Sequence, residues 1–466
     1  MVFSEPVFMF MFLPVSLLIY YAVPFRFKNA VLFLTGLLFY SWGEPIYVLI
    51  MILSTLIDYL AGRTMDKFDS NEKARKAALI VSVIMNLSLL GVFKYSGMVI
   101  DTVNSLLGTA IHNPNLPLPI GISFFTFQSM SYTIDLYRRN ITVQKSFVNF
   151  AAFVTMFPQI VAGPIVRYED VARELESRKI NFNEISSGIS IFICGLCKKV
   201  LIANSVGELW TNVKEMDYSS LPAVTAWLGI IAFTLQIYFD FSGYSDMAIG
   251  LGKMLGFNFP QNFDYPYNSK SVSEFWRRWH MTLGGWFKSY VYFPLGGSRN
   301  GKAKTIRNLL IVWALTGIWH GASWNFAIWG IYYGIILILE KFVFAGVMKK
   351  LPDFVKRIYT LLMVVIGWVI FEISSPASEL GFIGAMFGTG GKFIDASAVN
   401  MIHNYLITIV IAAIVATGLP LKIWKNLSEK IKGTDAVCIA GEAAGMAASI
   451  AYLVDASYNP FLYFNF

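Results

Sequence analysis

His320 stands in an apolar run of the sequence, where an ionisable side chain is costly. It lies within residues 317–326, which read GIWHGASWNF, and no charged residue separates it from Arg307. If this stretch is helical, at about 1.5 Å per residue, His320 lies roughly 20 Å beyond the arginine. That depth is well inside a hydrocarbon core about 30 Å thick, so His320 is a candidate site residue. The alternative is a histidine that pairs with a polar group of a neighbouring helix.

His280 is the second histidine in a polar island, and it follows Trp276 at helical spacing. The sequence has no HExxH motif, no histidine pair at i and i+4, and no carboxylate beside either histidine at metal-ligand spacing, so we expect no metal. A desolvated imidazole stays neutral and can accept a proton. As a general base it contributes on the order of 100- to 10,000-fold to a rate. Trp319, Trp324 and Asn325 could orient the imidazole of His320 or an acyl chain, although packing is the alternative for the tryptophans.

The composition indicates a membrane protein with many helices. Of 466 residues, 56% are hydrophobic and 14% charged, where a soluble domain has about 25% charged. The net charge of +8 comes from lysines and arginines clustered between apolar runs, which is the pattern of cytoplasmic loops rather than of a nucleic-acid surface. The three cysteines make no disulfide framework, and Cys194 and Cys197 lie in an apolar run, which favours packing over redox or metal chemistry.

The apolar segments predict an all-α bundle of about eleven or twelve transmembrane helices forming a single domain over residues 1–466, with both termini outside. Two regions differ from plain spans. Residues 161–166 (VAGPIV) predict a re-entrant segment that lines an internal tunnel, with simple helix breaking as the alternative. Residues 240–304 predict an interfacial segment, because five aromatic or apolar residues fall on one helical stripe: Phe275, Trp279, Leu283, Trp286 and Tyr290. Residues 240–326 form the motif-rich core.

Lys198 and Lys199 fall in the middle of an apolar segment at residues 185–206. One interpretation tilts this helix along the inner surface, with both lysines reaching the interface. The other places the pair in a pocket that faces an anionic ligand. The residue pattern leaves both open.

Four ordered motifs resemble the membrane-bound O-acyltransferases (MBOAT), specifically the bacterial branch that acetylates alginate and other exported polysaccharides. The motifs are SEFWRRWHMTLGGWFKSYVYFPLGGSR with GIWHGASWNF, PIGISFFTFQSMSYTIDLYR, FPQIVAGPIVRYED and a C-terminal PFLYFNF. The resemblance implies a helical bundle around a tunnel, with His320 as the catalytic histidine and His280 as the second conserved polar position. The chain departs from the branch at Asn465 and Phe466, where Arg-Phe is common.

The resemblance also implies a function. We expect an O-acetyltransferase of the bacterial inner membrane that holds no bound cofactor and takes acetyl from a cytoplasmic thioester, acetyl-CoA, for an extracytoplasmic polysaccharide. His320 would deprotonate the accepting hydroxyl, on the glycan or on a partner's serine, and His280 would position or polarise the thioester. The phosphates of acetyl-CoA would be held by basic residues, namely Lys198, Lys199, Arg277 and Arg278. A secreted or membrane-anchored esterase-like partner is implied too.

Two rival functions remain open. One is D-alanyl transfer to teichoic acid, which keeps the fold and requires an acyl carrier protein at the cytoplasmic face. The other is a channel or transporter for a glycan or lipid, in which flux would survive the loss of both histidines. The concentration of polar residues at 240–325 argues against the transporter.

Overall fold

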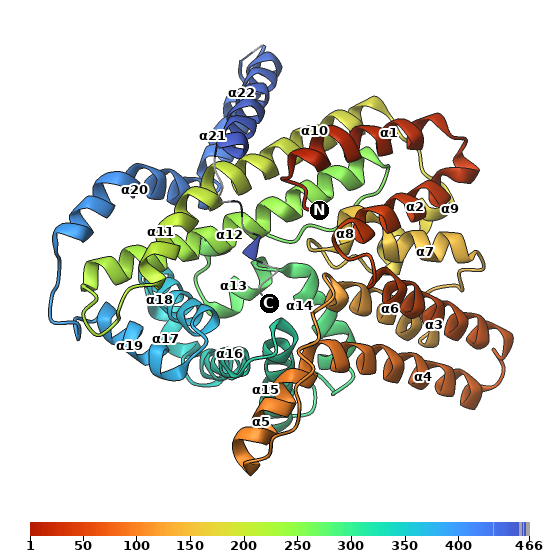
Figure 1. The fold of residues 1–466 in the computed structure, drawn as a ribbon, viewed down its shortest axis with the longest axis horizontal. Coiled ribbons are helices and arrows are strands. Elements are labelled where there is room, and N and C mark those ends of the chain that lie inside the picture. The colour runs from red at the N-terminus through yellow and green to blue at the C-terminus, as the bar shows by residue number, and fades with distance from the viewer. Residues whose placement is uncertain (432, 456–458, 460, 463–466) are drawn as a thin grey trace. The chain divides into compact units, whose positions relative to one another are not determined.

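The computed structural model describes residues 1–431, 433–455, 459, 461 and 462, and regular structure in that part of the chain is helical throughout (Figure 1). The predicted all-α class is therefore confirmed. Asn465 and Phe466, where the sequence departs from the pattern it resembles, lie outside the described residues.

Eight of the described helices are long and apolar enough to cross a membrane. They are Val48–Lys67, Glu72–Leu107, Phe182–Lys214, Ala223–Met254, Trp324–Phe342, Asp353–Glu372, Ala396–Ala416 and Thr434–Asp455. A polytopic membrane fold is thus confirmed. The number is lower than expected because some predicted spans form shorter or more basic helices. Phe8–Ala22 is a shorter apolar helix, and Lys302–His320 begins with three basic residues in its first two turns.

By its contacts the chain divides into two compact units, and the single domain expected over residues 1–466 stays a prediction. The first unit comprises residues 1–192 and 244–261. Its elements are η1 (Phe8–Phe12), α1 (Leu13–Ala22), α2 (Phe25–Gly43), α3 (Val48–Lys67), α4 (Glu72–Leu90), η2 (Gly91–Tyr95), α5 (Ser96–Leu107), α6 (Ile122–Tyr137), α7 (Phe147–Thr155), α8 (Phe157–Ile160), α9 (Tyr168–Glu176) and parts of α10 (Phe182–Cys197) and α12 (Ala223–Met254).

A buried polar cluster lies within the first unit, where α3 packs against α4 and α6. Asp58 of α3 is fully buried and accepts hydrogen bonds from Ser82 Oγ at 2.5 Å and from Asn86 Nδ2 at 2.8 Å. Ser54 Oγ donates to Asn86 Oδ1 at 2.7 Å. These side chains satisfy one another, as buried polar groups in a membrane bundle must.

The segment at residues 161–166 is irregular and fully covered by protein. Helix α8 ends at Ile160, and Ala162, Ile165 and Val166 are at most 1% exposed. Gly163 has a φ of +114°, which glycine adopts without strain. Non-helical backbone buried inside the protein agrees with the predicted re-entrant segment, while its lining of a tunnel stays a prediction.

The second unit comprises residues 193–243 and 262–466. Its further elements are η3 (Lys198–Ala203), α11 (Asn204–Lys214), η4 (Pro266–Asn268), α13 (Val272–Arg278), α14 (Met281–Phe287), η5 (Lys288–Tyr292), α15 (Lys302–His320), α16 (Trp324–Phe342), α17 (Ala345–Lys350), α18 (Asp353–Glu372), α19 (Pro376–Met386), α20 (Ala396–Ala416), α21 (Leu419–Ser428) and α22 (Thr434–Asp455). Its core is rich in aromatic side chains, among them Trp279, Trp329, Trp368 and Phe371.

Two boundary predictions in this region are wrong. Residues 240–254, expected to belong to the interfacial segment, are instead the last turns of α12, which continues to Met254. The predicted stripe from Phe275 to Tyr290 is not one helix, because α13 ends at Arg278 and α14 begins at Met281. Between them His280 adopts the left-handed conformation, with a φ of +43°.

Candidate active site

His320 is held at the end of a tightly packed helix pair. It is the last residue of α15, and the chain turns back through Gly321 into α16. Gly317 of α15 and Gly330 of α16 face each other, and a Cβ on either would overlap backbone atoms of the other helix. Glycines at such a contact let two helices approach closely. The position of His320 therefore follows from glycines in its own motif and in the next helix.

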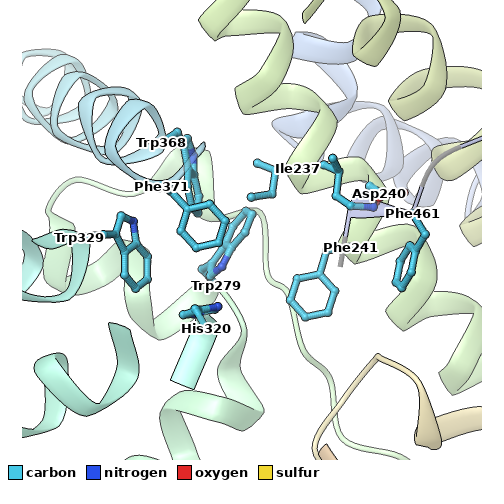
Figure 2. Close-up of a pocket in the computed structure, with 10 residues that line it drawn as sticks. Ile237, Asp240, Phe241, Trp279, His320, Trp329, Trp368, Phe371 and Phe461 are labelled. Atoms are coloured by element: carbon cyan, nitrogen blue, oxygen red, sulfur yellow. The ribbon is translucent and has the colours of Figure 1, made fainter. Parts of the chain in front are cut away.

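The His320 imidazole faces a small aromatic pocket of about 20 Å³ (Figure 2). Its ring centroid lies 5.0 Å from that of Trp329 and 5.4 Å from that of Phe371, both nearly edge-on. Figure 2 shows Trp279 next to His320, with Phe241 and Phe461 on the opposite side of the pocket from Trp329. Apart from Asp240, the residues that line this pocket with His320 are apolar.

His280 is positioned by Asn262, which lies eighteen residues earlier in the chain, in the loop between α12 and α13. Its Nδ1 lies 3.0 Å from Asn262 Oδ1, and its ring packs edge-on against Phe241. The residue is 2% exposed and lies outside the eight membrane-crossing helices. Burial lowers the pKa of His280 to about 3, so its ring is neutral at physiological pH. Among the described residues, Nε2 has no hydrogen-bond partner.

Both histidines line one larger cavity of about 460 Å³, as expected for residues that act together. Trp276 and Arg277, two of the predicted site residues, line it as well. His280, Trp276, Gly284 and Phe287 share its wall despite the break between α13 and α14. A second cavity of about 380 Å³ is lined by Glu340 and shares Ser273, Leu309 and Lys341 with the first.

Three cations line the larger cavity without a carboxylate to neutralise them. Arg277, Lys288 and Lys341 form no ion pair with any residue that the structure describes. All three side chains are exposed at the cavity wall, where cations can pair with the phosphates of an anionic ligand. The cavity therefore offers a positive wall next to two imidazoles.

Three other predicted cations have different surroundings. Arg278 binds Glu274 at 2.9 Å and Asp264 at 3.1 Å, so carboxylates already neutralise it. Lys199 is buried and pairs with Asp240 Oδ1 at 2.7 Å. The Asp240 carboxylate also accepts the backbone N–H of Leu462 at 2.9 Å. Lys198 lies against Gly243 of α12. A role for these three in holding phosphates stays a prediction, and the ion pairs give Arg278 and Lys199 a structural one.

The remaining predicted site residues are spread around the histidines. The Trp319 ring lies 5.1 Å from the ring of His320 and 6.0 Å from that of His280. Asn325 is buried, and its amide donates to the carbonyl of Phe371 at 2.8 Å, which ties α16 to α18. Trp324 is 55% exposed at the start of α16. Of these three, Trp319 is the residue in ring contact with both imidazoles.

Sequence reasoning missed several residues of this site. Lys288 lies in the predicted interfacial segment at residues 240–304, which indicates an interface rather than a cavity. Lys341 follows an apolar segment, which indicates a loop, and Trp279 is predicted only as a member of the aromatic stripe. Asn262 had no sequence signal, because it reaches His280 only through the folding of the loop between α12 and α13.

Comparisons with known proteins identify the family of the chain. The model of the family described as MBOAT, membrane-bound O-acyltransferase, matches residues 37–377, which include both histidines. The chain is 36% identical to the probable alginate O-acetylase AlgI of Pseudomonas putida over the full length of both. It is 32% identical to the peptidoglycan O-acetyltransferase of Helicobacter pylori over all of this chain and 98% of that protein. The teichoic acid D-alanyltransferase of Bacillus subtilis is 27% identical over 50% of this chain.

Proposed function

Because the chain belongs to the membrane-bound O-acyltransferase family and is a multi-pass O-acyltransferase, we propose that it moves acetyl from a cytoplasmic thioester to a hydroxyl of an exported polysaccharide. The observation that carries this proposal is the cavity in which His280 and His320 meet three uncompensated cations. Relatives whose names specify alginate and peptidoglycan acetylation support a polysaccharide as the final acceptor.

The proposed acyl donor is acetyl-CoA, which the protein uses as a substrate. Its phosphates would meet Arg277, Lys288 and Lys341 as charge partners. The second cavity, next to Lys341, is the proposed entrance, because the basic residues that follow α16 indicate a cytoplasmic end. From there the thioester would reach His280 and His320 through the larger cavity, because the two cavities share Ser273, Leu309 and Lys341 as lining residues.

In the proposed reaction His320 removes the proton of the accepting hydroxyl. The hydroxyl oxygen forms a bond to the carbonyl carbon, the C–S bond breaks, and the departing sulfur takes the electron pair and then the proton. The products are an acetyl ester and a free thiol. The indole walls around His320 exclude water, which would otherwise compete with the hydroxyl.

The location and partner are part of the proposal. The charge pattern of the loops supports both termini outside, and the resemblance to the polysaccharide-acetylating branch implies a bacterial inner membrane. The immediate acceptor is either the glycan or a serine of a secreted or membrane-anchored esterase-like partner, as the family resemblance implies. D-alanyl transfer is the second candidate, and the likeness over half the chain to a teichoic acid D-alanyltransferase favours it to a lesser degree.

The test is the acetyl content of the exported polysaccharide in cells that carry His320→Ala. We expect a loss of about 100-fold or more in transfer, since a general base contributes that much. His403→Ala is the matched control, because His403 is exposed on α20 and its loss should leave acetylation unchanged. Full acetylation by His320→Ala at equal membrane expression would contradict the proposal. A change in D-alanine content instead would favour the second candidate.

A further inference from the structure

Asn262 organises the turn that carries His280. Its backbone carbonyl accepts the N–H of Met281 at 2.9 Å. Its side-chain Oδ1 accepts the Thr282 backbone N–H at 3.3 Å and the Thr282 hydroxyl at 2.9 Å, and it lies 3.0 Å from His280 Nδ1. One side chain thus fixes both the backbone and the ring at the break between α13 and α14.

These contacts determine which nitrogen of His280 carries the proton. A backbone N–H can only donate, so the atom of Asn262 that faces Thr282 must be the oxygen. That oxygen can only accept, so the neighbouring His280 Nδ1 must carry the hydrogen. We infer that Asn262 is a positioning residue that holds His280 in the Nδ1–H tautomer and turns a proton-free Nε2 into the cavity. The inference deepens the proposed function and rests on it for its catalytic meaning.

A proton-free Nε2 separates the two roles that the sequence left open for His280. To polarise the thioester carbonyl, the ring would have to donate a hydrogen bond from Nε2, and this tautomer has no hydrogen there. It can instead accept a hydrogen bond from an amide N–H in the arm of the thioester substrate, which positions the acyl group. With its pKa lowered to about 3 by burial, His280 accepts hydrogen bonds but holds a full proton poorly, which leaves the general base role to His320.

The charged groups around His280 favour the same neutral state. Arg277, Lys288 and Lys341 line its cavity together with His320 and Tyr292. The loop also carries the carboxylate of Asp264, two residues after Asn262, and Arg278 neutralises it. Phe241 and Trp319 cover the ring. Positive charge and apolar walls both disfavour an imidazolium here.

The first test is the pH dependence of acetyl transfer by Asn262→Asp. A carboxylate beside Nδ1–H stabilises the imidazolium and raises the pKa of His280, by about 1–3 units. The raised pKa then lies at about 4–6. Below it, Nε2 becomes protonated and can no longer accept, so activity should fall as the pH decreases from about 6 toward 4. Wild type should lose no activity through this ring in that range. Identical profiles of Asn262→Asp and wild type would overturn the inference.

Two further variants separate positioning from a merely structural role. Asn262→Ala should raise KM for acetyl-CoA about tenfold, as expected for one lost hydrogen bond of about 1.4 kcal/mol, without moving the pH profile. Thr282→Val removes a hydroxyl bonded to the same oxygen but leaves His280 bound, so KM and the profile should stay as in wild type. If Thr282→Val reproduces the KM of Asn262→Ala, Asn262 acts only on the loop and the inference fails.

A spectroscopic test does not depend on activity. The chain has four histidines, so ¹⁵N-histidine NMR of the full-length protein in lipid is tractable, and His280→Asn assigns the ring. We expect a protonated Nδ1 and an unprotonated Nε2 at pH 7, and loss of this pattern in Asn262→Ala. The reverse tautomer would refute the inference even if acetyl transfer is confirmed. A correct tautomer in a protein that transfers no acetyl would instead refute the proposed function.

Discussion

The polar cluster of the first unit and the histidine cavity of the second both lie among apolar helices. They differ in how far their buried polar atoms are hydrogen-bonded within the protein. Around Asp58, the carboxylate, two hydroxyls and an amide satisfy one another at 2.5–3.0 Å. In the cavity, His280 Nε2 and Trp276 Nε1 have no hydrogen-bond partner among the described residues. The closed network stabilises a fold, whereas the open groups are available to a ligand.

Within the second unit, arginines and lysines also divide into those that pair with a carboxylate and those that do not. Arg277 and Arg278 are adjacent, but carboxylates bind Arg278 whereas Arg277 faces the cavity with no ion pair among the described residues. Lys199 is neutralised by Asp240, whereas Lys288 and Lys341 form no ion pair with a described carboxylate. Substitutions should therefore divide into those that change stability and those that change substrate binding.

The largest effect on stability is expected for Lys199→Met. It leaves the carboxylate of Asp240 buried without its cation, which costs about 3–5 kcal/mol in the free energy of unfolding. Adding Asp240→Asn should restore most of this, because the asparagine oxygen still accepts the Leu462 N–H. Thermal unfolding of the purified protein in detergent measures both. A double variant as unstable as the single would show that the pair is not the source of the loss.

A smaller loss of stability is expected for Asp58→Leu. Ser82 and Asn86 would be left buried without their acceptor, at a cost of roughly 2–3 kcal/mol. The donor KM and the turnover per folded molecule should stay as in wild type, which acetyl-transfer assays on matched amounts of folded protein can check. A fall in turnover with normal stability would break the comparison, because it would make the closed cluster part of the reaction.

The smallest effect on stability, with a clear effect on binding, is expected for the cavity cations. Arg277→Gln, Lys288→Gln and Lys341→Gln should each raise KM for acetyl-CoA about tenfold, as hydrogen bonds to charged groups contribute about 1.5–3 kcal/mol. Unfolding midpoints should change little. Steady-state kinetics at two salt concentrations measures the KM for acetyl-CoA. Salt should weaken binding more in wild type than in a variant that combines all three substitutions.

Arg278→Gln is the matched control for these three substitutions. Its guanidinium is already bound by Glu274 and Asp264, so its loss should lower the unfolding midpoint and leave KM within about twofold. If Arg278→Gln raises KM as much as Arg277→Gln does, the distinction between paired and open cations does not hold.

Much of this site could be predicted from residue types and local spacing. The helix that ends at His320, and the helical spacing of His280 with Trp276, Gly284 and Phe287, are local properties, and the structure has both. The depth of His320 in a membrane stays a prediction. The pairing of Arg278 with Glu274 has a local signal in its i,i+4 spacing, whereas its pairing with Asp264 depends on the folding of the loop. The pairing of Lys199 with Asp240 spans 41 positions, the difference between 240 and 199, and has no local signature.

The break at His280 shows why the helix period misled. Phe275, Trp279 and Leu283 keep helical spacing through the break, and no glycine or proline marks it. The left-handed conformation at His280 is disfavoured for a residue with a side chain, by about 1–2 kcal/mol, and the bonds to Asn262 offset this. A tertiary contact thus overrides a local pattern, and it does so at a residue of the candidate site.

The glycine contact between α15 and α16 also limits which substitutions the chain can tolerate during evolution. An enlarged side chain in a core is often rescued when its neighbour becomes smaller, but Gly317 and Gly330 already oppose each other with no side chain on either. A substitution at one position therefore has no compensating substitution at the other. We expect deep mutational scanning to find both positions intolerant and without second-site suppressors in the facing helix.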